Sequence, residues 1–149
     1  MRSSIIARVT FGLVALVIVN LVAGRERREG KYAPFPAPDA GYVTDLADLL
    51  SEEQERKLER WLRQTEEESG VEIIVVTIES IRDYPGTPQR NIEPFARALF
   101  DAYGIGNLPR NDGVLLLVAR RDRDARIELG AGYGRAKDGV AMRIMARKI

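Results

Sequence analysis

Residues 111–134 read NDGVLLLVARRDRDARIELGAGYG, and this stretch decides the fold. Its apolar block, Val114–Ala119, is continuous, which is typical of a strand buried on both faces of a sheet. The segment Ala125–Leu129 alternates, with charged and apolar side chains on opposite faces, as expected at a sheet margin half open to water. The charged run between them predicts a solvated turn. The stretch therefore predicts an antiparallel hairpin whose open end carries Asp112 and the glycine loop 130–134.

The segments before the hairpin predict two helices and one strand. A capping box at Ser51 and a terminal Gly70 bound the first helix, and Asn91 and Gly104 bound the second. The β-branched run between them, residues 71–79, predicts a central strand. A strand–helix–strand crossover makes this strand and the first strand of the hairpin parallel. Residues 43–50 are too short for a helix and predict a turn and an arm on the sheet.

Helical spacing predicts which side chains these helices bury. The first helix should bury Leu58, Trp61 and Leu62. A last helix, opening at Asp138, should turn Val140 and Ile144 inward. The second helix carries a longer apolar stripe, made of Ile92, Phe95, Ala96, Leu99, Phe100 and Tyr103.

Composition excludes several classes of chemistry. The 149 residues contain no cysteine and no histidine, which removes disulfides, thiolate chemistry, Ser-His-Asp and Cys-His catalysis and histidine zinc sites. The net charge is +1, so nucleic-acid binding is not indicated. A dinucleotide site is not predicted either, because the third glycine of the G-x-G-x-x-G fingerprint would fall on Arg135.

The N-terminus predicts targeting to a membrane. In residues 1–24, Arg2 and Arg8 precede a long apolar run, as in an export signal that is cleaved or in an uncleaved signal anchor. Residues 25–42 are rich in proline and predict a semi-extended linker. The folded domain is expected over residues 43–149.

The open end of the hairpin also predicts a binding site. Asp112, the Gly130, Gly132 and Gly134 backbone, and Asp45 and Asp138 from neighbouring segments provide oxygens suited to calcium or magnesium. A metal so held would orient water against a phosphate ester. The alternative is structural: Asp112 and Asp138 serve as caps, and the glycines supply positive φ angles. Asp45 and Asp48 are likewise open to use in turns.

Several short motifs together resemble one known family, the TPM domain. They are Val43-x-Asp45, Leu49-Leu50-Ser51, Gly70-Val71-Glu72-Ile73, Ala96-x-x-Leu99-Phe100, Gly104-Ile105-Gly106, Asn111-Asp112-Gly113-Val114-Leu115-Leu116 and Arg126-Ile127-Glu128-x-Gly130-x-Gly132-Tyr133-Gly134. The resemblance implies an α/β fold, an αβα sandwich with a small mixed sheet, located outside the cytoplasm. Compared with relatives, the last helix is expected to be shortened at the C-terminus.

Two functions follow from the resemblance. One is an exported or membrane-tethered module, periplasmic or at the cell surface, that binds a protein partner or assists membrane-protein assembly or repair. The other is a metal-assisted acid phosphatase using calcium or magnesium, for which the sequence names no catalytic residue. By position, the metal ligands carried over are Asp45, Asp112 and Asp138. The basic residues after the apolar run oppose export by the positive-inside rule, but interleaved Glu26 and Glu29 and the resemblance favour it.

Overall fold

The computed structural model describes residues 30–134, 139–141, 143 and 144. The chain divides into one unit ending at Ala37 and a second beginning at Pro38. The predicted signal or anchor, residues 1–24, and the start of the linker lie outside the described residues. Within the described part, no helix is both long enough and apolar enough to cross a membrane.

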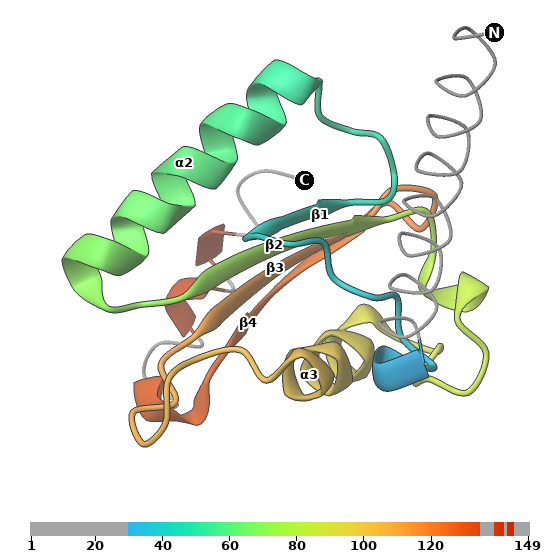
Figure 1. The fold of residues 1–149 in the computed structure, drawn as a ribbon. Helices are drawn as coiled ribbons and strands as arrows, with labels where there is room; N and C mark the ends of the chain where they lie inside the picture. Colours follow the sequence, from blue (N-terminus) through green and yellow to red (C-terminus); the bar gives the residue numbers. More distant parts are fainter. Residues whose placement is uncertain (1–29, 135–138, 142, 145–149) are drawn as a thin grey trace, which may run out of the picture. The chain divides into compact units, whose positions relative to one another are not determined.

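The second unit is built on a mixed four-stranded sheet in the order β1-β2-β3-β4 (Figure 1). The strands are β1 (Val43–Asp45), β2 (Ile73–Ile78), β3 (Val114–Ala119) and β4 (Asp124–Leu129). The first three are parallel and β4 is antiparallel to β3. The predicted parallel crossover and antiparallel hairpin are therefore confirmed.

The strand β1 replaces the predicted arm. Its three residues pair with β2 in the register Val43↔Val75 to Asp45↔Thr77. So short a segment has no detectable periodicity, and its strand conformation depends on pairing with β2.

The helices α2 (Glu52–Ser69) and α3 (Ile92–Tyr103) cover opposite faces of this sheet (Figure 1). Ser51 and Gln54 form the predicted capping box, and Gly70 ends α2 in the left-handed conformation at φ 71°. Gly104 ends α3 in the same way. These boundaries are confirmed because each depends on side chains within four residues of the helix end.

The two helices bury different amounts of apolar surface. The α3 stripe is confirmed: all its predicted members are buried except Tyr103, which is half-buried. On α2 only Leu62 is fully buried, and Trp61 is 60% exposed. Trp61 was wrongly assigned to the core because α2 contacts the sheet along a narrow stripe on Val43 and Val75, from which residue 61 turns away.

The hairpin also differs from its prediction. Leu115, Leu117 and Ala119 are buried in β3, whereas the alternate residues are only half-buried. In β4 the two charged side chains expected to face water, Arg126 and Glu128, are largely covered. Glu128 is 5% exposed and accepts a hydrogen bond from Arg97 of α3 at 3.2 Å. Arg126 binds the other carboxylate oxygen at 3.2 Å. Since α3 packs on β4, Arg126 and Glu128 pair with each other and with Glu93 and Arg97 of the helix.

The described part of the C-terminal segment buries a different residue from those predicted. Ala141 is 6% exposed, whereas Val140 and Ile144 are 40% and 52% exposed. The inward orientation predicted for these two side chains is therefore wrong.

Candidate functional site

The candidate site lies where β2 and β3 begin and β4 ends. Antiparallel pairing brings the segment before β3 against the loop after β4, as predicted: the Gly130 amide donates to the Gly113 carbonyl, and the Gly132 amide to the Asn111 carbonyl, both at 2.9 Å. Asp112 is therefore beside the glycine loop.

The glycines permit close backbone contact. A Cβ at Gly130 would overlap the Asn111 carbonyl, and one at Gly132 would overlap the Arg110 carbonyl. The expected positive φ holds only for Gly134, at 61°. At the other two positions, space rather than dihedral angle requires glycine.

Asp112 is the most unusual residue of this edge. It is 8% exposed, and its Oδ2 accepts from the Arg110 guanidinium at 2.8 Å. Its Oδ1 is buried and has no hydrogen-bond partner among the described residues. Burying a carboxylate oxygen without a hydrogen-bond partner costs free energy. This oxygen is therefore a candidate contact for a cation or for a group that donates a hydrogen bond.

Tyr133 lies near this carboxylate. Burial raises the pKa of Tyr133, the negative charge of Asp112 raises it further, and Arg110 lowers it. The phenol therefore stays neutral through the physiological range.

Glu72 enters the same edge from the start of β2. Its Oε2 accepts from the Gly106 amide at 2.6 Å. A Cβ on Gly106 would meet the Gly113 backbone, so the loop before β3 packs directly on the strand entry. Glu72 fixes this loop, and the loop in turn supports Asp112.

Asp45 is placed at the opposite end of the sheet. It pairs with Thr77, which pairs with Val118, six residues beyond Asp112. At 3.3 Å per residue, this separation is roughly 20 Å. Asp45 and Asp112 are therefore not brought together and do not share one ion. The third predicted ligand, Asp138, lies outside the described residues.

Asp45 acts as a cap. Its carboxylate accepts from the Leu49 and Leu50 amides at 3.2 and 2.8 Å and from the Thr77 hydroxyl. Burial alone would raise the pKa of Asp45, but these hydrogen bonds outweigh it and lower the pKa below its usual value. The turn-forming alternative accounts for this residue.

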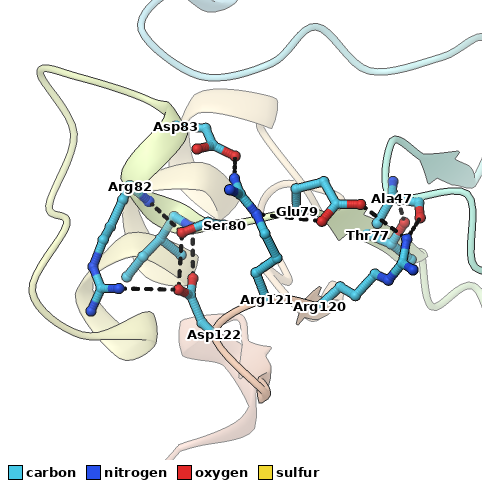
Figure 2. A network of polar contacts seen from close by, with 10 residues as sticks. Ala47, Thr77, Glu79, Ser80, Arg82, Asp83, Arg120, Arg121 and Asp122 are labelled. Carbon is cyan, nitrogen blue, oxygen red and sulfur yellow. Dashed lines mark hydrogen bonds and ion pairs between the residues drawn. The ribbon is translucent and has the colours of Figure 1, made fainter.

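A polar network ties the loops together at this end of the sheet (Figure 2). Asp122 accepts from the Ser80 hydroxyl and the Ile81 amide, each at 2.9 Å. Arg121 pairs with Glu79 and Asp83. Since Asp122 and both acids that face Arg121 have partners, this end is a cross-linked turn and Asp112 remains the stronger site candidate.

The donors around Asp112 are compatible with a hard cation. Calcium and magnesium take carboxylate and carbonyl oxygens. Asp112 offers its buried Oδ1, and the Arg110 and Asn111 carbonyls of the same segment lie against the glycine loop. Within the described residues no three acidic side chains are grouped so that they could hold a metal ion together, so a cation at Asp112 would need backbone oxygens or water to complete its shell.

The comparisons with known proteins identify the family and the fold. The family profile of the TPM domain matches residues 43–149. The chain belongs to the TPM-domain family. No curated protein sequence matches it significantly.

Two solved structures resemble this TPM domain. The N-terminal domain of a P. gingivalis protein, solved by NMR, is 36% identical with a TM-score of 0.59; the similarity covers 72% of this chain and 65% of that one. The N-terminal domain of a Corynebacterium glutamicum protein is 18% identical with a TM-score of 0.53, over 77% and 73% of the two chains, and supports the fold alone. This chain therefore spans just under two thirds of the P. gingivalis domain.

Three residues at the same edge of the sheet as Asp112 were not predicted as site residues: Glu72, Arg110 and Tyr133. Glu72 and Tyr133 belong to the short motifs that resemble the TPM domain, and this membership could have marked both as candidates. Arg110 stands two residues before Asp112, but only the folded loop shows that the two side chains pair.

Proposed function

We propose that this TPM domain is exported, is held at a membrane by residues 1–24, and binds a divalent cation, calcium or magnesium, at Asp112. The unpartnered, buried Oδ1 of Asp112 carries the cation proposal. The apolar N-terminal run and the proline-rich linker support export and tethering.

The described residues that would hold the cation are Asp112, through Oδ1, and the backbone carbonyls of the adjoining loops. The ion would supply a positive charge linking the loop before β3 to the loop after β4. Both loops are already joined through Asn111 and Gly132. Binding would therefore stabilise one surface at this edge, suited to a protein partner in membrane-protein assembly or repair.

Substitution of Asp112 by Asn tests the cation. The change keeps the shape and removes the charge, so calcium should raise the melting temperature of the parent and raise that of Asp112→Asn much less. At ten times the dissociation constant the stabilisation is about 1.4 kcal/mol, or about 5 °C for a domain of this size.

Asp45→Asn is the matched control. It removes a capping carboxylate roughly 20 Å away, so the variant should lose stability but keep the full calcium response. If calcium shifts neither the parent nor the control, the cation proposal fails.

Metal-assisted phosphatase activity is the second candidate. The Arg110 guanidinium beside Asp112 supports it, because its side chain is 62% exposed and such a group binds phosphate oxygens. Purified protein should then release phosphate from a model ester, and chelation should abolish the release. Calcium binding without phosphate release would leave binding as the function.

A further inference from the structure

Two buried carboxylates of this domain each meet an exposed arginine. Asp112 pairs with Arg110 at 2.8 Å, and Glu128 pairs with Arg97 at 3.2 Å. Glu128 has a second partner, because Arg126 binds its other oxygen. Asp112 has a buried oxygen with no partner among the described residues. Arg110 therefore balances the negative charge of Asp112 but is a partner for only one of its two carboxylate oxygens.

The arginine is the mobile partner of this pair. Asp112 has a side chain 12% exposed and stands two residues before β3, whereas the Arg110 side chain is 62% exposed. A cation arriving at Oδ1 would repel the guanidinium on Oδ2. Arg110 is the group that has room to move away.

A second favourable position for Arg110 lies beside it. Its Nη1 is 3.3 Å from where a Cβ on Gly70 would stand, at the residue that ends α2. The last turn of α2 contains no basic residue, and a helix C-terminus attracts positive charge. The displaced guanidinium can therefore remain against the end of α2.

We propose that Arg110 is an internal competitor for the cation, which holds Asp112 until a divalent ion displaces it. This inference rests on the proposed cation site. Arg110 then limits how tightly the ion binds. An ion binds Asp112 only when the free energy of its own interaction exceeds the free energy lost by breaking the ion pair with the guanidinium. Neutralising Arg110 should accordingly strengthen binding.

The test is calcium affinity, measured by titration calorimetry on the full chain in detergent. Arg110→Gln should lower the dissociation constant about tenfold or more, because the change removes a positive charge that would otherwise repel a divalent ion on the same carboxylate. Arg110→Lys keeps the charge and should stay close to the parent. Arg110→Gln combined with Asp112→Asn should lose the gain.

Arg97→Gln is the matched control. It also removes an exposed arginine from a buried carboxylate, but on the face beneath α3, so calcium affinity should not change. Equal or weaker binding by Arg110→Gln would show that the arginine positions Asp112, which overturns the competitor role and leaves the cation site standing. Absence of binding in both the parent and Arg110→Gln would overturn the cation site as well.

Discussion

Asp45 and Asp112 show how position gives one residue type two roles. Asp45 ends β1, and its carboxylate accepts from two amides of the turn that follows and from the Thr77 hydroxyl of β2. Asp112 has one buried oxygen with no hydrogen-bond partner among the described residues. The distinction lies in the donors around each carboxylate, which are two backbone amides and a hydroxyl for Asp45 and a single guanidinium for Asp112.

Asp45→Asn should make the free energy of unfolding less dependent on pH in the acid range. The pKa of Asp45 is lowered in the folded state, so its stabilisation is fully present above the unfolded pKa and is lost as pH falls through the folded pKa. At pH 7 the variant should be about 1 kcal/mol less stable. Urea unfolding between pH 7 and pH 2 should show the gap closing below about pH 4; a constant gap would contradict this role.

At the level of elements, Glu59 joins α2 to β1. Its carboxylate accepts from the Tyr42 and Val43 amides at 2.9 and 3.1 Å. Glu66, two turns further along α2, accepts from the Tyr42 hydroxyl at 2.5 Å. This hydrogen bond, with burial and the Glu66 charge, raises the pKa of Tyr42 to about 12. A three-residue edge strand thus gains side-chain contacts that its own pairing cannot supply.

Glu59→Ala should release the start of β1. Two backbone donors lose their acceptor, which costs about 1–3 kcal/mol. Thermal melting would measure the loss, and hydrogen exchange should show faster exchange at the Val43 amide in particular. Glu67→Ala, on an exposed position of the same helix, should be nearly neutral. Equal effects of both changes would mean that only helix propensity is involved.

At the level of the whole molecule, the two ends of the sheet differ in how their polar groups are paired. At the end where β1, β2 and β3 finish, arginines and acids cross-link the loops (Figure 2). At the other end, glycines bring backbone segments together around a half-satisfied Asp112. We expect the first end to stabilise the domain and the second to bind.

Export is tested on the whole chain in cells. With residues 1–24 as a signal or anchor, the domain should stand outside the cytoplasmic membrane. Protease added to intact spheroplasts should therefore digest it, while a cytoplasmic marker protein stays whole. Digestion only after lysis would place the domain in the cytoplasm.

The sequence by itself determined the features that depend on near neighbours and on strand order. Helix limits at Ser51, Gly70 and Gly104 follow from caps. Parallel pairing of β2 and β3 follows from the crossover, and the meeting of Asp112 with the glycine loop follows from the hairpin.

Only the tertiary structure decided the features that depend on distant partners. Three residues become β1 because β2 lies beside them, and their parallel direction places Asp45 at the other end of the sheet from Asp112. Glu128 is buried because α3 supplies Arg97. The periodicity of a sequence shows which side chains of a helix or strand share a face. Which residues cover that face depends on segments far away in the chain.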